Sequence, residues 1–519
     1  MLADDVPAAS ALVVSDGRIV FVGSDGEAAR FADGAGSVPV DLAGRLVTAA
    51  FVDAHVHCVQ VGQVADGLDL HGARSRQEVL AAVRAYVGAR PGSRIVVGQG
   101  WDECGWSEPV PPTRLELDRA APGVAVYLAR VDVHSAVVSS ALLDRLPDVS
   151  GLRGFTADGW LSQDAHHRCR GEMDSLFTDG ERRSAIRVAL REAARQGVAT
   201  VHELGGPHLG PAADLLRVRE EAAALGVAAV AYWGELASPE TLERARSVGA
   251  VGLAGDLCVD GAIGSRTAAL RQPYTDAAGR GVRYLSDSEI TEHLVLCTRA
   301  GVQAGFHCIG DDAVAAAVAG LRRAAERVGR DAVRAARHRL EHVEMVDPDD
   351  LTTLADLGVV ASVQPAFDAA WGGPGELYES RLGRRATGMN PFGDLHRAGV
   401  TLAFGSDAPV TPLAGWETVR AAVHHHRPEQ RLDVRAAFDA ATRGGHQAVG
   451  DDQAGLLAVG ARADLAVWDV DPGTLDPATG LPRLEPADPL PRCVATLGAG
   501  RVLQTDADAL GKLPACHPR

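Results

Sequence analysis

Two histidines separated by one residue follow an apolar run near the N-terminus, in Phe51-Val-Asp-Ala-His-Val-His57. Residues 47–56 predict a buried strand, and alternation along a strand puts His55 and His57 on one face. Two imidazoles side by side at a strand end can bind one divalent cation. Because such a pair is also common at ordinary surface or core positions, a metal site requires further ligands elsewhere in the chain.

Three later segments repeat this arrangement, in which an apolar strand ends in a side chain that can bind a metal. Such strands are expected at residues 302–307, 338–342 and 401–407, each flanked by helix-like sequence. In a parallel β/α array every strand delivers its last residue to the same rim, where active sites form. We therefore predict that five side chains converge on a metal at this rim: His55, His57, His307, His342 and Asp407.

Eight strands, the number that a closed barrel of this type requires, can be placed in order along the chain. The first is the strand at 47–56, and the others are expected at 197–203, 227–233, 256–259, 302–307, 338–342, 359–363 and 401–407. A long interval, about 59–196, separates the first two. It contains expected helices at 75–89 and 179–196 and expected strands at 95–97 and 124–129.

Further motifs extend along most of the chain. They are Gly100-Trp-Asp102, Arg130-Val-Asp-Val-His134, Asp260-Gly-Ala-Ile-Gly-Ser-Arg-Thr-Ala268, Phe306-His-Cys-Ile-Gly-Asp311, Arg339-Leu-Glu-His342 and Gly405-Ser-Asp-Ala-Pro409. Together with the histidine pair, they resemble the amidohydrolase superfamily of metal-dependent hydrolases, and most of all its amidohydrolase-3 branch, the YtcJ-like and N-substituted formamide deformylase-like group.

The resemblance implies an α/β fold, a distorted (β/α)8 TIM barrel with a small β-sandwich formed from both chain ends. The barrel is expected at 49–452 and the composite sandwich at 1–48 plus 453–519. The interval after the first barrel strand becomes an insertion over the barrel mouth. Within the sandwich, residues 11–22 predict a hairpin that turns at Asp16-Gly17.

The implied activity is hydrolysis of a C–N bond other than a peptide bond (EC 3.5) in an amide, formamide or cyclic amide. Imidazoles and a carboxylate suit Zn²⁺ and also accept Fe²⁺ or Mn²⁺. The ion would polarise the substrate carbonyl and lower the pKa of a bound water from about 16 toward about 7. By resemblance, Asp407 takes the proton of water and passes it to the leaving nitrogen, although Ser-Asp-Ala-Pro could also cap a helix. His342 is either a ligand or a substrate contact.

Two other functions use the same barrel. One is a metal-dependent isomerase, or a hydrolase of a different bond, which the same ligands would serve. The other is a non-catalytic scaffold, as in relatives that have lost their metals. The intact set of His55, His57, His307 and Asp407 argues against the scaffold.

The fourth strand departs from the pattern of binuclear relatives. Many of these carry a carboxylated lysine that bridges two metals, whereas the corresponding residue here is Asp256. We therefore expect one ion per chain. Alternatively, Asp256 or Glu203 helps to hold a second ion, or Asp256 is a surface residue at the start of its strand.

The remaining candidates contact substrate only by resemblance. Arg266 would bind a substrate carboxylate or carbonyl, and Asp260 would orient its loop or a ligand. Trp101, Asp102 and His134 would line the pocket. The alternatives are a salt-bridged Arg266, plain packing of Trp101 and a turn cap at Asp260.

Two histidine runs and two cysteines are expected to be structural. His424-His-His426 and His166-His167 are interpreted as solvated helix faces, because consecutive helical residues point about 100° apart. Cys58 and Cys308 follow ligand positions and turn to the opposite face of their strands as small core residues.

Composition limits the partners and the location. The net charge of -17 (51 basic minus 68 acidic residues) disfavours nucleic acid and anionic membranes as partners. The chain shows neither a signal-peptide pattern nor an apolar run that could span a bilayer. Scattered cysteines are typical of a reduced cytoplasm. We expect a cytoplasmic enzyme with a small-molecule substrate, in which a homodimer is possible.

Overall fold

Eight parallel strands form the central sheet of this computed structural model, which describes residues 9–32 and 37–506. They are β4 (Phe51–Val56), β10 (Val198–Gly205), β11 (Ala228–Trp233), β12 (Gly252–Leu253), β13 (Gln303–Cys308), β14 (Arg339–His342), β15 (Val360–Val363) and β16 (Thr401–Phe404). Each pairs with the next in chain order, and a parallel bridge between Val56 and Ala408 joins the last to the first. The predicted (β/α)8 barrel is confirmed.

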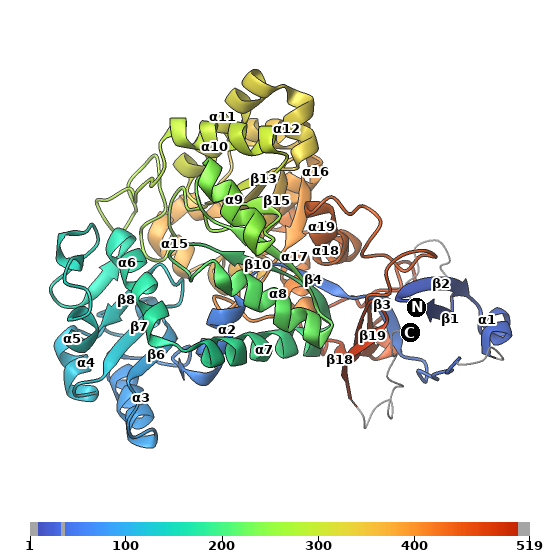
Figure 1. Cartoon of the computed structure of the whole chain (residues 1–519), viewed down its shortest axis with the longest axis horizontal. Helices are drawn as coiled ribbons and strands as arrows, with labels where there is room; N and C mark the ends of the chain where they lie inside the picture. The colour runs from blue at the N-terminus through green and yellow to red at the C-terminus, as the bar shows by residue number, and fades with distance from the viewer. Residues whose placement is uncertain (1–8, 33–36, 507–519) are drawn as a thin grey trace.

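Helices cover the outside of the barrel (Figure 1). They are α8 (Ala213–Leu225), α9 (Pro239–Val248), α10 (Asp287–Ala300), α11 (Asp311–Val328), α12 (Arg330–Ala336), α13 (Pro348–Asp356), α16 (Phe392–Arg397), α17 (Gly415–Val423), α18 (Val434–Ala441) and α19 (Arg443–Ala448). Two further helices, α14 (Pro365–Trp371) and α15 (Leu377–Leu382), contribute side chains to a cavity at the strand ends. The barrel strands are buried, and most of their residues are apolar, as in parallel sheets covered on both faces. The core therefore lies between the strands and their helices.

The two chain ends meet in antiparallel sheets beside the barrel, at the right of Figure 1. Strands β3 (Leu46–Ala49), β17 (Leu465–Asp469), β18 (Arg492–Gly498) and β19 (Arg501–Thr505) form one sheet. Strands β1 (Ala11–Ser15) and β2 (Arg18–Gly23) form the predicted hairpin, which precedes α1 (Asp25–Ala32). The hairpin turns through the left-handed region at Asp16 and Gly17, with φ of 50° and 74°.

The long interval after β4 folds around a sheet of its own. Its strands are β5 (Leu68–Asp69), β6 (Ile95–Trp101), β7 (Ala125–Arg130), β8 (Ser135–Val138) and β9 (Trp160–Ser162). Its helices are α2 (Cys58–Asp66), α3 (Arg76–Ala89), α4 (Arg114–Ala120), α5 (Ser140–Leu143), α6 (Gln163–Met173) and α7 (Asp179–Arg195). Helices α2 and α7 pack so closely that a Cβ at Gly62 would lie 2.2 Å from Ala185. This contact joins the first helix of the insertion to its last.

Two predicted strands differ from the structure. The expected strand 47–56 is two strands, because β3 pairs with β17 in the terminal sheet and β4 pairs with β10 in the barrel. The fourth barrel strand was predicted at 256–259, but it is β12, which ends at Leu253. Asp256 therefore follows the strand end, at the rim, instead of starting the strand.

Across the described ranges, we find no helix that is both long and apolar enough to cross a membrane.

Candidate metal centre and active site

Asp407 and the first histidine pair meet at the carboxyl ends of the barrel strands. His55 lies in β4, His57 follows it directly, and Asp407 follows β16. The Asp407 Oδ1 atom lies 3.3 Å from His55 Nε2 and 3.2 Å from His57 Nε2. All three side chains are buried, so segments 350 residues apart meet in one enclosed cluster.

Asp256 completes the cluster from the turn after β12. Its Oδ1 lies 3.5 Å from His55 Nε2 and 3.8 Å from His307 Nδ1, and its Oδ2 lies 3.3 Å from His57 Nε2. No lysine occurs among residues 9–506. A carboxylate, and not a carboxylated lysine, therefore stands between the first histidine pair and the later histidines.

His342 lies beside His55 and His307 in this cluster. Its ring centroid is 4.4 Å from that of His307 and 5.0 Å from that of His55. The ligand atoms of His55, Asp256 and His342 lie within 4.8 Å of one another, as do those of His55, His57 and Asp407. The five predicted residues thus come together at one site, and Asp256 joins them.

Hydrogen bonds hold three of the imidazoles by their outer nitrogen. The Nδ1 atoms of His55, His57 and His342 contact Glu341 Oε2 at 3.0 Å, the Leu204 carbonyl oxygen at 2.9 Å and Gln364 Oε1 at 2.8 Å. These oxygens only accept, so each Nδ1 donates and, in a neutral ring, leaves the lone pair of Nε2 pointing inward. Metal-binding histidines are held in this way.

Several inward-facing atoms have no hydrogen-bond partner. Among the described residues, His55 Nε2, His342 Nε2 and Asp256 Oδ1 are buried and unsatisfied. Buried polar atoms without partners are rare and costly. Imidazole nitrogens and carboxylate oxygens whose lone pairs face one another can together bind a divalent cation placed between them.

The charges of the buried side chains also favour a cation at this site. Burial opposes a positive charge on His57, but Asp256 and Asp407 outweigh it and raise its pKa to about 9. Burial would also raise the pKa of Asp407, yet the neighbouring His55 and His57 hold it well below its ordinary range. Two buried carboxylates thus favour positive charge at the point where the imidazoles meet.

An ion pair beneath the cluster fixes His55. Arg339 donates from Nε to Glu341 Oε1 at 2.5 Å and from Nη2 to Glu341 Oε2 at 2.9 Å. Burial opposes ionisation of Glu341, but Arg339 and His55 lower its pKa to about 2. An ionised Glu341 therefore accepts from His55 and keeps its ring in place.

The backbone is strained at two of these residues. His342 and Asp407 have φ of 71° and 52°, a region that residues other than glycine seldom occupy. Such conformations cost about 1–3 kcal/mol and are concentrated at functional sites.

Comparison with known proteins accounts for this arrangement. Residues 39–504 match the model of the amidohydrolase family. The chain belongs to this family. It is 26% identical to the putative amidohydrolase YtcJ of Bacillus subtilis, over 85% of this chain and 87% of that protein. It is 24% identical to the N-substituted formamide deformylase of Arthrobacter pascens, over 91% and 92%.

Solved structures agree with the assignment to the amidohydrolases. A metal-dependent hydrolase from Pyrococcus furiosus is 28% identical, covers 89% of this chain and 95% of its own, and superposes with a TM-score of 0.68. A second, from Pyrococcus horikoshii, is 26% identical, covers 89% and 93%, and has a TM-score of 0.70. The chain is thus a metal-dependent hydrolase.

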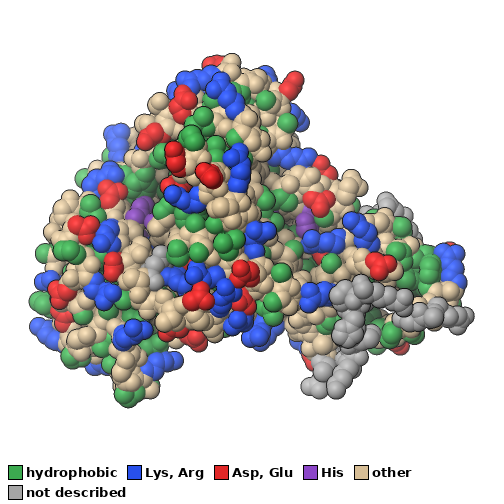
Figure 2. Space-filling view, viewed as in Figure 1, with side chains coloured by type: hydrophobic (Ala, Val, Ile, Leu, Met, Phe, Trp, Pro, Cys, Tyr) green, Lys and Arg blue, Asp and Glu red, His purple; other side chains and the backbone are tan. Residues whose placement is uncertain are grey.

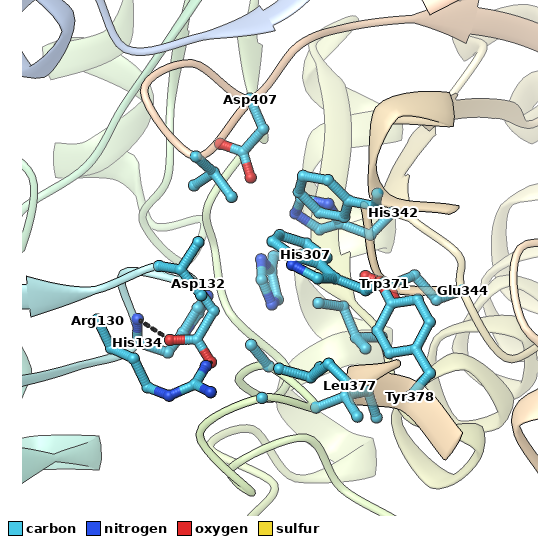
Figure 3. A pocket seen from close by; sticks show the side chains of 17 residues that line it. Arg130, Asp132, His134, His307, His342, Glu344, Trp371, Leu377, Tyr378 and Asp407 are labelled. Atoms are coloured by element: carbon cyan, nitrogen blue, oxygen red, sulfur yellow. Dashed lines mark hydrogen bonds and ion pairs between the residues drawn. The ribbon is translucent and has the colours of Figure 1, made fainter. Parts of the chain in front are cut away.

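Two cavities open onto the cluster of this amidohydrolase. Both are lined by Asp407, His307 and His134. In Figure 3, Asp407 lies across the first cavity from Trp371 and Tyr378, with His307 and His342 between. His134, one of the predicted pocket residues, lies with its ring centroid 5.0 Å from that of His307.

Three other predicted substrate contacts lie elsewhere. Trp101 is fully buried among insertion residues and donates to the Leu128 carbonyl oxygen at 3.1 Å. Asp102 accepts from Arg130 Nη2 at 2.5 Å. Arg266 pairs with Asp276 at 2.7 Å. Trp101, Asp102 and Arg266 do not line either cavity. Each is satisfied by a protein partner that the sequence motif did not reveal.

Asp260 fixes the loop that carries the Arg266 motif. Its carboxylate accepts from the backbone N–H groups of Ala269, Ile309 and Gly310 at 2.8, 3.0 and 2.8 Å. Asp260 therefore joins this loop to the end of β13, close to His307. In this position it orients the loop, as predicted for one of its two roles.

Both histidine runs are less exposed than predicted. His425 is fully buried, and His426 Nδ1 donates to Asp368 Oδ1 at 2.5 Å. His166 is buried and His167 lines the second cavity. The prediction of solvated helix faces was wrong, because the partner elements lie far away in sequence. Cys58 and Cys308 are buried, as predicted.

Sequence reasoning undervalued Asp256 and missed Arg170, which lines the second cavity. Gly255, with φ of 85°, signals the turn that carries Asp256 to the rim. For Arg170 the only signal was its spacing, four residues after His166 on one helix.

Proposed function

We propose that this amidohydrolase hydrolyses a C–N bond other than a peptide bond, in an amide, formamide or cyclic amide, with Asp407 as the general base and then the general acid. One observation carries the proposal. The Asp407 carboxylate stands where both cavities meet, within 3.3 Å of two imidazoles that have inward-facing nitrogens. The named activity of the Arthrobacter relative supports the choice of bond.

The ligands proposed for the metal are drawn from His55, His57, His307, His342, Asp256 and Asp407. Zn²⁺ suits these donors best, and Fe²⁺ or Mn²⁺ also fit. When bound, such an ion polarises a carbonyl and makes water a better nucleophile. We propose one ion per chain, with Asp256 as the carboxylate that would contact a second ion if two were present.

Asp407 has the properties that proton transfer needs. Its low pKa keeps it ionised at neutral pH, so it begins the reaction as an acceptor. It takes a proton from the attacking water and delivers that proton to the nitrogen as the C–N bond breaks. His55 and His57 hold its Oδ1 in place while it does so.

The first cavity supplies an apolar environment beside the reacting carbonyl. Phe367, Trp371 and Tyr378 line it together with Ile263 and Ile309. These side chains would exclude water around one substituent of the amide and bind that substituent by burial of apolar surface.

The test combines metal analysis with a screen of N-formyl and N-acyl compounds for release of a free amine. We expect about one equivalent of zinc or iron and amine release that falls about 10²- to 10⁴-fold in Asp407→Asn. The matched control is Asp349→Asn, the same chemical change at an exposed residue of α13. A metal-loaded wild type that releases amine from none of the compounds would contradict the proposal, as would full activity in Asp407→Asn.

A further inference from the structure

The two cavities that meet at Asp407 differ in character. The first is mainly aromatic and aliphatic. The second is lined on the insertion side by His166, His167 and Arg170, and on the barrel side by His208. Figure 2 shows histidine side chains in a hollow between the insertion and the barrel. A substrate that spans the centre therefore meets an apolar wall on one side and a polar, cationic wall on the other.

Each cavity is lined by one arginine, and among the described residues the two differ in their ion pairs. Arg130, in the first, lies 2.5 Å from Asp102, 2.8 Å from Glu103 and 3.3 Å from Asp132. Arg170, in the second, has no carboxylate within 4.0 Å and no side-chain hydrogen bond among the residues that the structure describes. It is only half-exposed, so its charge is partly withdrawn from water.

Helix α6 holds Arg170 in this position. Ala165 and Cys169 are buried in the core of the insertion, and Tyr127 Oη lies 2.8 Å from His166 Nε2. Residues four apart lie on one helix face, so fixing His166 points Arg170 into the same cavity. The neighbouring Arg168 points away and pairs with Asp148 at 3.0 Å. An arginine on the outer face of this helix thus forms an ion pair with a neighbouring carboxylate.

The surroundings favour an anion over a second cation. The ligand atoms of His167, His208 and Cys258 lie within 4.8 Å of one another, a spacing that could hold a metal. However, burial and the nearby Arg170 charge lower the pKa of His167 to about 4, and the same Arg170 charge repels a cation at this point. The imidazoles are neutral, so the positive charge on this wall is that of Arg170.

We propose that Arg170 binds an anionic group of the substrate. The amide that is cleaved then carries a carboxylate or similar anion on one side of the scissile bond and an apolar group on the other. This assignment of substrate class rests on the proposed C–N hydrolysis. A planar guanidinium can bind a carboxylate through two parallel hydrogen bonds, and that of Arg170 has no such bond to the residues that the structure describes.

Binding measurements test the proposal without catalysis. The protein is Asp407→Asn in excess zinc, with its bound metal checked by elemental analysis. The probes are phenylacetylglycine, an anion, and phenylacetylglycinamide, its neutral counterpart. A second pair, succinanilic acid and its carboxamide, places the anion on the acyl side. We expect the anion of at least one pair to bind roughly 10- to 100-fold more tightly than its neutral counterpart, by calorimetry.

Variants then assign the preference to Arg170. Added to Asp407→Asn, Arg170→Met should abolish the preference, Arg170→Lys should retain part of it, and Arg168→Met should leave it intact. Thermal unfolding checks that each variant is folded. Equal binding of both members in both pairs would overturn the proposal. An unchanged preference in Arg170→Met would also overturn it, because the carboxylate would then be bound by the metal.

Turnover separates this proposal from the proposed function. If wild type releases amine faster from the anionic member and Arg170→Met removes that advantage in KM, both stand. If the anion binds through Arg170 but no C–N bond is cleaved in any compound, the proposed function fails and the anion site remains.

Discussion

Two groups of histidine and aspartate in this barrel offer ligand atoms at metal-binding distances, and they differ in what already satisfies those atoms. At the rim, His55 Nε2, His342 Nε2 and Asp256 Oδ1 are buried without hydrogen-bond partners. In the second group, formed by Asp368, His425 and His426, the ligand atoms are also within 4.8 Å of one another. Proximity alone therefore does not distinguish the two.

The second group is a closed hydrogen-bond network. Asp368 accepts from the ring and the backbone N–H of His426 at 2.5 and 3.0 Å. His425 Nε2 donates to the Asn390 carbonyl oxygen at 2.9 Å, and its Nδ1 accepts from the Arg427 N–H at 3.0 Å. This group joins α14 to the segment after α17 and needs no cation. Unsatisfied inward lone pairs, and not the residue types, are what predict a metal.

The largest effect is expected from His55→Ala. This change removes a ring that faces both Asp256 and Asp407, and should weaken metal binding more than about 100-fold, since loss of an outer partner alone costs about 10- to 100-fold. Elemental analysis and amine release should both fall to background. Retention of stoichiometric metal would mean that the rim does not bind it.

Asp256→Asn should have the next largest effect. It removes one of two buried negative charges while keeping the size of the side chain, so we expect metal affinity to fall about 10- to 100-fold. Titration of apo-protein with zinc measures this. If wild type holds two equivalents and this variant one, the prediction of a single ion is wrong and Asp256 bridges a pair.

Gln364→Ala tests the outer contacts of the rim. Gln364 Oε1 accepts from His342 Nδ1, so its loss frees the ring to turn. We expect activity to fall about 10-fold with little change in the melting temperature. Activity equal to that of wild type would show that the His342 ring does not need to be held in place. His342 would then be a substrate contact instead of a metal ligand.

Removal of the metal by a chelator should show which of the two groups binds the ion in wild type. Removing a bound ion lowers stability by RT ln(1 + [M]/Kd), which is about 2.7 kcal/mol when the free metal exceeds Kd 100-fold. The melting temperature should therefore fall for wild type but not for His55→Ala. A fall of the same size in both would mean that another group binds the ion.

The smallest catalytic effect is expected from Asp368→Ala. This change leaves donors of His426 without an acceptor and should lower the free energy of unfolding by about 1–3 kcal/mol. Metal content should equal that of wild type. Loss of metal from this variant, with the fold intact, would break the distinction between the two groups.

Much of the rim could be predicted because local rules determine it. The strand period places His55 and His57 on one face, and parallel β/α topology brings the ends of β4, β13, β14 and β16 to one rim. The hairpin at Asp16-Gly17 and the sheets from both chain ends also follow from short-range patterns and the family resemblance. These features need only neighbours along the chain and a common topology.

Partner choice between distant segments could not be predicted in this way. The short strand β12 releases Asp256 to the rim, Asp276 neutralises Arg266, and Asp368 lies 58 residues before the His426 that it fixes. Arg170 has no such partner among the described residues, although Arg168, two residues before it on the same helix, pairs with Asp148. The sequence by itself determined which side chains could bind a metal and where their strands end. Only the tertiary structure decided which charges are already satisfied, because that depends on the three-dimensional proximity of residues far apart in the chain.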